Sequence, residues 1–464
     1  MPIHNLPREV LEMIFSEEAG FGRSYYHRLF RLRSVCKYWM EIIDSTTELW
    51  RQIRLILHPE LQAMILRNSR DRTLFVEYDE RIWPMDSSRQ AKMAAFASLI
   101  EPTTSRWKEL QYGPASDSSN DTWILSRSFP NLHSLSIVEY TWKDPHRRLD
   151  APKLQRLSVD YGSLNWKSLS GLTYLDLNHT NATLGEFVAV LQASPQLSFL
   201  AVQKTQLRFE QEDLQTAAVS KISLPQLHSF YACGSKAQSL SLLLDWIVAP
   251  PLRNFHIREQ YKKDSEDCTR LFELAGRYIG AFPLPECEKV HGVFISVRDS
   301  EIRLAIGSRR ITVLNATWTS ESGPRDRMDY LASFLKHLDG RVCGMVKFLW
   351  LRGWGNGEIG RYMGMLHARF PQINELVLQV QRPDEGDMGV FCGHLTGSTA
   401  LGQGEEWLFS KLTKLRLDHE LLMNGGLAQL LQLIEIRRSA RQVEAIEELR
   451  IAALSPRIDS STVE

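Results

Sequence analysis

An irregular internal repeat runs through most of this 464-residue chain and limits what the chain can fold into. In each copy an apolar residue is followed three and five positions later by two more, as in Leu132, Leu135 and Ile137. Because side chains alternate along a strand, the last two members supply one face of a short strand, and the first turns the chain into the core. The copies begin at Trp107, Leu132, Leu154, Leu172, Leu197, Leu227, Leu252, Val290, Ile311, Val346, Ile373, Leu412 and Ile446.

The stretches between these predicted strands favour helices that would back the strands, as at 185–192, 236–248, 269–279, 327–338 and 359–369. Stacked units of this kind resemble leucine-rich repeats. We therefore predict an α/β fold, in which residues 56–454 form an irregular leucine-rich-repeat solenoid with a curved parallel sheet and residues 455–464 form a disordered tail. Spacings run from 18 residues (Leu154 to Leu172) to 39 residues (Ile373 to Leu412), so we expect an uneven arc. The alternative is a generic α/β domain.

The first fifty residues have a different pattern, which predicts short amphipathic helices. Pro7 suits a first helical turn because its missing N–H is not needed there, and Glu9 favours the positive end of the helix dipole. Two apolar faces with helical spacing follow, at Val10, Leu11, Ile14 and Phe15 and then at Leu29, Leu32, Cys36, Trp39 and Ile43. Two or three short helices bury too little surface to offset chain entropy comfortably, so these faces predict a partner.

Residues 1–55 resemble an F-box, the adaptor-binding module of Skp-cullin-F-box ubiquitin ligases, and the solenoid would follow this small all-helical domain. Between Phe15 and Val35 the chain is longer than the usual module, and 17–22 replace the family's usual turn. The resemblance implies that the adaptor is bound by Leu6, Pro7, Glu9, Leu11, Ile14, Phe15, Leu32, Val35, Cys36, Trp39, Leu49 and Trp50. We expect Leu11 and Trp39 to be partly exposed in the isolated chain. The alternative is an ordinary helical hairpin packed on its own domain.

The outward positions of the predicted strands are candidates for binding a target protein. They lie between and after the core pair of each copy, and they combine aromatic residues with arginine, as interface hot spots do. The target-binding candidates are Tyr174, Phe199, Tyr231, His256, Arg258, Trp350, Arg352 and Arg416. Asn315 and Lys414 occupy the same kind of position, and loops could cover some of this set. The glycine-rich stretch 383–406 is a second candidate for holding a target, or a tolerated insertion.

Composition argues against several other classes of function. The 55 basic residues balance the 55 acidic ones, so no net field draws the chain to nucleic acid or anionic lipid. No apolar run is long enough to cross a membrane and no secretion signal opens the chain, so we expect a cytoplasmic or nuclear protein. The six cysteines form no C-x-x-C pair and the thirteen histidines form no metal-binding motif, so we expect neither disulfides nor a metal site.

One motif could suggest a cofactor. Residues 355–360 read G-x-G-x-x-G, and Asp384 follows at the distance of a ribose-binding acid. Here, however, the preceding strand is one repeat among many and Trp354 crowds the turn, so we interpret the motif as a helix start. We expect no cofactor, and dinucleotide binding remains the alternative.

These observations predict a non-catalytic substrate-recognition subunit. The resemblance implies that the F-box binds a Skp-type adaptor, that the adaptor connects the chain to a cullin ligase, and that other subunits perform the ubiquitin chemistry. The solenoid would hold a target protein. A scaffold that binds the adaptor outside a cullin ligase is the alternative from another class, and an enzyme built on the solenoid is the third.

Overall fold

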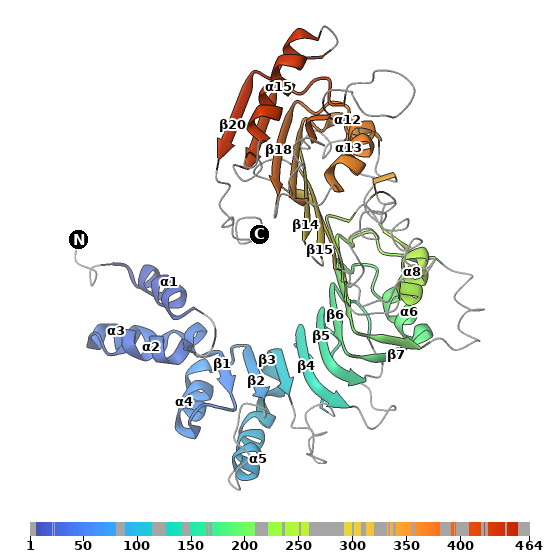
Figure 1. Ribbon diagram of the computed structural model, residues 1–464. Coiled ribbons are helices and arrows are strands. Elements are labelled where there is room, and N and C mark those ends of the chain that lie inside the picture. Colours follow the sequence, from blue (N-terminus) through green and yellow to red (C-terminus); the bar gives the residue numbers. More distant parts are fainter. Residues whose placement is uncertain are drawn as a thin grey trace. The chain divides into compact units, whose positions relative to one another are not determined.

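The computed structural model is described in its well-placed parts, which contain the N-terminal helices and most strands of the sheet (Figure 1). The described residues are 6–20, 22, 24–79, 89–113, 127–141, 149–163, 166, 169–208, 221–233, 237–249, 252–258, 292–298, 301–307, 312–319, 332, 335–336, 340–354, 358–380, 391–393, 395, 408–418, 422, 426–440 and 443–452.

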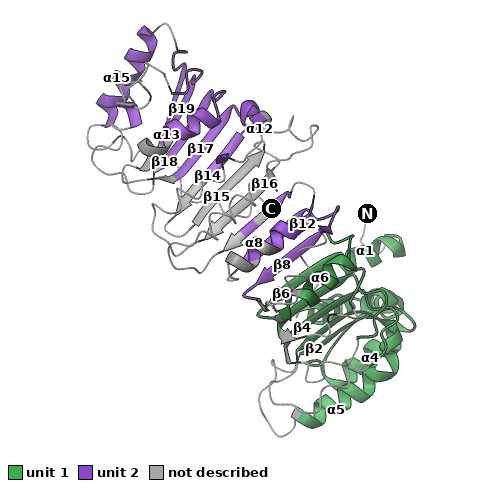
Figure 2. Ribbon diagram, turned by 90° about the vertical axis from the view of Figure 1, so that its right-hand side faces the viewer, with its two compact units in different colours: residues 1–197, 207–213 green, residues 198–206, 214–464 purple. Residues whose placement is uncertain are grey.

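The chain divides into two compact units, shown in different colours in Figure 2. Unit 1 contains Met1–Leu197 and Leu207–Asp213, and unit 2 contains Ser198–Gln206 and Leu214–Glu464. The N-terminal helices and the first six strands therefore belong to unit 1.

Unit 1 begins with three short helices, α1 (Arg8–Ala19), α2 (Tyr25–Arg33) and α3 (Lys37–Ser45), followed by the 3-10 turn η2 (Thr47–Trp50). Helix α1 starts directly after Pro7, as predicted, and ends at Gly20, whose φ of 58° is a conformation that favours glycine. Helix α3 starts after Cys36, whose Sγ accepts a hydrogen bond from the Trp39 backbone N–H at 3.5 Å. The predicted N-terminal helices are thus confirmed.

These helices form a core of their own that continues into the first strand, β1 (Gln52–Arg54). The Trp50 ring is fully buried, stacks near Tyr26 with centroids 6.0 Å apart, and donates from Nε1 to the Ile43 carbonyl at 2.8 Å. The Tyr26 hydroxyl donates to the carbonyl of Gln52 at 2.5 Å. Because this bond reaches the first residue of β1, the helices are attached directly to the sheet.

Helix α4 (Pro59–Ser69) strengthens the same connection through one buried amide. Gln62 Nε2 donates to the carbonyls of Arg54, Leu55 and Leu57 at 2.9–3.1 Å. These carbonyls lie where β1 ends, so the amide provides acceptors there with a donor from α4. In Figure 1, α4 and α5 (Arg89–Ile100) lie on the same side of the first strands.

The sheet of unit 1 is parallel, and its strands follow one another in chain order. After β1 come β2 (Leu74–Asp79), β3 (Trp107–Gly113), β4 (Ser134–Thr141), β5 (Arg156–Ser163) and β6 (Tyr174–Asn178). The strands predicted at Trp107, Leu132, Leu154 and Leu172 are confirmed, and the core pairs of these copies are buried. Helix α6 (Leu184–Gln192) follows β6 and confirms the helix predicted at 185–192.

Unit 2 contains ten strands of the described sheet, in the spatial order β8-β11-β13-β16-β15-β14-β17-β18-β19-β20. They are β8 (Phe199–Gln203), β11 (Ser229–Cys233), β13 (Asn254–Arg258), β14 (Gly292–Arg298), β15 (Glu301–Gly307), β16 (Thr312–Thr319), β17 (Phe348–Trp354), β18 (Glu375–Val380), β19 (Lys414–Asp418) and β20 (Glu448–Ala452).

The described helices of unit 2 are α8 (Ala237–Trp246), α12 (Gly340–Met345), α13 (Glu358–Arg369) and α15 (Gly426–Ser439). Helices α8 and α13 confirm the helices predicted at 236–248 and 359–369. Helix α13 begins at the fourth residue of the G-x-G-x-x-G motif, whose first three residues lie outside the described part. The predicted helices at 269–279 and most of 327–338, the tail 455–464 and most of 383–406 also lie outside it.

The expectation of an all-parallel sheet in chain order is wrong at three strands. Strand β15 is antiparallel to both β14 and β16, and the three strands enter the sheet in reverse order between β13 and β17. The reason is the length of the connection, since only Asp299 and Ser300 separate β14 from β15. A parallel pair needs a crossover of about a dozen residues, whereas two residues suffice for a hairpin.

The last repeat copy departs from the predicted burial. Ile451 of β20 was expected in the core, but its side chain is 46% exposed. Within the described residues β20 pairs with β19 alone, so it stands at an edge where the row of buried residues stops.

Arg437 in α15 is buried, and its guanidinium is surrounded by backbone carbonyls. Its guanidinium donates to the carbonyls of Leu395, Leu408, Phe409, Leu412 and Glu444 at 3.0–3.5 Å, and its burial lowers the pKa of Arg437 to about 10. One side chain thus joins the helix to the turns on both sides of β19.

We expect Arg437→Met to destabilise unit 2 by about 3 kcal/mol or more, because several buried carbonyls lose their donor together. The urea midpoint of unfolding measures this effect. Arg438→Met is the matched control, since Arg438 is the exposed neighbour on the same helix, and it should change stability by less than about 0.5 kcal/mol. Equal midpoints for the two variants would contradict the role given to Arg437.

Candidate functional site

The N-terminal helices have their own buried core and also expose large apolar side chains. On α1, Leu11 and Phe15 are buried, whereas Val10 and Met13 are 38% and 71% exposed. Around the start of α3, Val35 is 60% exposed and Tyr38 is 41% exposed. We call Val10, Met13, Val35 and Tyr38 the N-terminal apolar set. These four side chains are accessible to a partner of the module.

The expectation that Leu11 and Trp39 are partly exposed is wrong. Leu11 is 0% exposed and Trp39 only 7%. The Trp39 ring packs against Phe15 with centroids 4.8 Å apart, so α1 and α3 bury it between them. Both residues therefore hold the module together before any partner binds.

The other predicted adaptor-binding residues include both buried and exposed side chains. Phe15, Leu49 and Trp50 are also buried, and Leu6, Ile14 and Leu32 are partly exposed. The exposed members are Pro7, Glu9, Val35 and Cys36. The sequence pattern missed Met13 and Tyr38, which lie outside the helical spacing of the predicted faces.

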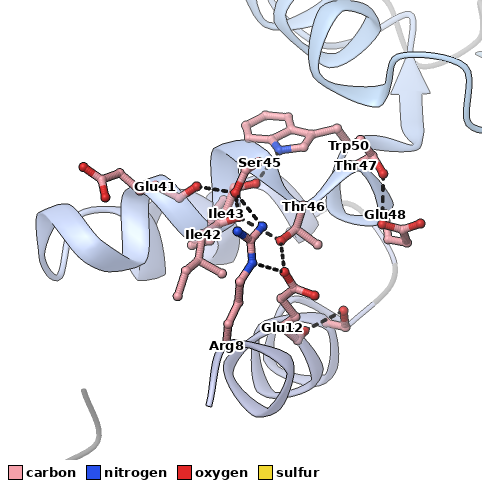
Figure 3. Close-up of polar contacts among 11 residues, drawn as sticks. Arg8, Glu12, Glu41, Ile42, Ile43, Ser45, Thr46, Thr47, Glu48 and Trp50 are labelled. Carbon is pink, nitrogen blue, oxygen red and sulfur yellow. Dashed lines mark hydrogen bonds and ion pairs between the residues drawn. The ribbon is translucent and has the colours of Figure 1, made fainter. Parts of the chain in front are cut away.

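A polar cluster joins the start of α1 to the end of α3 (Figure 3). Arg8 donates from Nε to Glu12 at 2.7 Å and from Nη2 to Ser45 Oγ at 2.8 Å. The Thr46 hydroxyl donates to the same Glu12 oxygen at 2.9 Å. Arg8 is half exposed, so its ion pair contributes little energy, but together these bonds set the relative orientation of the two helices.

The predicted target-binding residues lie on strands in both units. Tyr174 is in unit 1, where the Arg156 guanidinium stands over its ring at 4.7 Å. In unit 2, Phe199, Tyr231 and His256 lie on the neighbouring strands β8, β11 and β13, with ring centroids 5.1 Å and 5.8 Å apart. Arg258 is at the end of β13, and its side chain is outside the described part.

A second group in unit 2 contains Trp350, Arg352 and Arg416. Trp350 on β17 is opposite Val377 on β18, which is opposite Arg416 on β19. The Trp350 ring meets Phe294 edge to face at 4.9 Å, and its buried Nε1 has no acceptor among the described residues. Both core neighbours of Trp350 on the strand, Leu349 and Leu351, are fully buried, so the three candidates lie on the outward face.

Arg416 is not an isolated cation. Its Nη2 lies 3.0 Å from Glu375 Oε1 on the adjacent strand. On the next pair of strands Lys414 lies 3.5 Å from Glu448, which Arg450 also contacts. Sequence could not reveal these pairs, because they depend on which strands are neighbours and in what register.

Among the described residues, no group of three or more histidine, cysteine or acidic side chains could hold a metal ion. None of the described helices is long and apolar enough to cross a membrane.

Comparison with known proteins identifies one region. Residues 3–56 match the family described as F-box-like, which supports the interpretation of the chain as an F-box protein. The match covers α1, α2, α3, η2 and β1. A search of curated proteins finds no match to the chain.

Reversing the charge of Arg416 should destabilise unit 2 by about 1–2 kcal/mol, because Arg416→Glu places a second carboxylate beside the buried Glu375. Swapping both residues, as Arg416→Glu with Glu375→Arg, should recover most of this loss. A double-mutant cycle from urea unfolding measures the coupling. Additive effects in that cycle would show that the ion pair does not contribute to folding.

Proposed function

We propose that the chain is a non-catalytic substrate receptor of a Skp-cullin-F-box ubiquitin ligase. The observation that carries this proposal is the F-box-like match at residues 3–56, which coincides with helices that expose apolar side chains. F-box modules bind Skp-type adaptors, and the adaptor would connect the chain to a cullin. Ubiquitin transfer would then be performed by other subunits.

The N-terminal apolar set is the surface we assign to the adaptor. The buried residues of the module already pack against one another, so a partner cannot contact them. Met13 and Val35 are the most exposed of the four and would lose the most water-accessible surface on binding. A partner that covers them would gain the apolar contacts that dominate interface cores.

The remaining part of the proposal concerns the target. Residues 56–454 would be an irregular leucine-rich-repeat solenoid, with residues 1–55 as the F-box and 455–464 as the tail. Parallel strands at the repeat copies, with helices between them, support this assignment. The outward face of the sheet would bind the target protein, because regular strands hold its side chains in fixed rows.

We expect Met13→Glu combined with Val35→Glu to weaken binding of a purified Skp-type adaptor at least about thirtyfold, which corresponds to about 2 kcal/mol. Calorimetric titration of the full chain measures this. Unchanged affinity would show that the adaptor does not bind the N-terminal apolar set.

The matched control replaces two apolar residues of unit 2 that are also more than half exposed, as Leu431→Glu with Val248→Glu, and should leave adaptor affinity unchanged. Trp39→Ala is a poorer test, because Trp39 is buried inside the module and its loss should unfold the helices.

Co-purification separates the receptor from an adaptor-bound scaffold. We expect the tagged chain to bring down a Skp-type adaptor together with a cullin, and the Met13→Glu, Val35→Glu variant to lose both. Recovery of the adaptor without a cullin would favour the scaffold. Recovery of neither would contradict both functions.

A further inference from the structure

The outward face of β17–β20 carries more positive than negative charge, although the whole chain is neutral. We call it the basic face, and its charged positions are Arg352, Lys414, Arg416, Arg450, Glu375, Glu448 and Asp418. Four cations against three carboxylates leave an excess of one positive charge.

This excess is not a general property of the sheet. The outward positions of β1–β6 in unit 1 have the opposite balance, with Glu77, Asp79, Glu109, Asp160 and Asp176 against Arg54 and Arg156. The chain as a whole has 55 basic and 55 acidic residues. The outward positions of β1–β6 are therefore mainly acidic, and those of β17–β20 carry more basic than acidic residues.

The cations of the basic face also reach further into solvent than the glutamates that pair with them. The Arg416 side chain is 27% exposed and Glu375 only 11%. Glu448 is 30% exposed, compared with 46% for Lys414 and 60% for Arg450. A molecule that approaches this face meets the positive groups first.

A half-buried tryptophan lies in the same row as two of these cations. Trp350, Val377, Arg416 and Arg450 occupy one row across four neighbouring strands. Because neighbouring strands are about 4.8 Å apart, the row is about 14 Å long. Val377 is only 5% exposed, so Trp350 provides the accessible apolar surface of the row, and the two arginines lie at its other end. An extended peptide of five or six residues would span it.

Resting on the proposed function, in which the sheet holds a target, we propose that the basic face binds an extended segment of the target with an apolar side chain followed by aspartates or glutamates. The apolar side chain lies over Trp350. The carboxylates, two to four residues further on, reach Lys414, Arg416 and Arg450.

The pairing of the cations favours carboxylates over a phosphate group. Phosphate sites bring several arginines or lysines onto one dianion. Here Arg416 contacts Glu375, and Lys414 and Arg450 share Glu448, so each of these cations is already partly neutralised by a glutamate. The single charges of carboxylates fit such cations better than one dianion does.

Selection from a random library of 12-residue peptides on phage, with the full chain immobilised, tests the proposal. The enriched peptides should carry an excess of aspartate and glutamate within four residues of a leucine or aromatic residue. A synthetic peptide from this set should bind at least tenfold more weakly to the Lys414→Glu, Arg450→Glu variant and should weaken as salt increases.

The matched control reverses two exposed charges on helices, as Arg438→Glu with Arg67→Glu, and should bind the peptide like the wild type. No enrichment, enrichment of basic or neutral peptides, or equal binding to both double variants would overturn the proposal. A peptide with phosphoserine in place of its glutamates that binds tenfold more tightly would overturn the choice of carboxylates.

Adaptor titration of the same wild-type sample distinguishes a failure of the inference about the basic face from a failure of the proposed function. If the adaptor binds and the selection yields no acidic peptides, only the inference about the basic face fails. If the adaptor does not bind, the proposed function fails whatever the selection yields.

Discussion

The alternation of side chains along parallel strands is the constraint on which the rest of the structure depends. In unit 1, Leu110, Leu135, Leu157 and Leu175 stand opposite one another on successive strands and are buried. A shift of one residue on any strand would move its leucine to the solvent side. The buried row therefore also determines which side chains form the outward face, so core packing and binding surface are set by the same register.

In the N-terminal helices, one short sequence pattern contains residues of two kinds, those that stabilise the module and those that a partner can contact. Leu11, Phe15 and Trp39 belong to the spacing that identifies an F-box, and they are buried within the module. Val10 and Met13 lie on the same helix as Leu11 and Phe15 and are exposed. A motif that marks a binding module thus contains residues that keep it folded as well as residues that a partner could reach, and only burial separates them.

The strands and the helical nature of the N-terminus were predictable because both depend on local spacing. The hairpin β14–β15 was also visible, since Ile302, Leu304 and Ile306 alternate across a segment that we did not predict as a strand. Its place in the sheet was harder to foresee, because strand order depends on which edges pair. The ion pair of Arg416 with Glu375 joins residues 41 positions apart, and no local pattern predicts such a contact.

The glutamates of the basic face influence which anions can bind there. Glu375 and Glu448 stabilise the cations while the face is empty, and an incoming anion must compete with them for the same guanidinium and ammonium groups. This competition lowers the affinity for any single negative charge. The loss matters less for a ligand that also covers Trp350, because apolar burial adds free energy that the glutamates do not oppose. The proposed role of the face therefore predicts weaker binding of nucleic acid and other uniformly charged polymers than of a segment that combines apolar and acidic side chains.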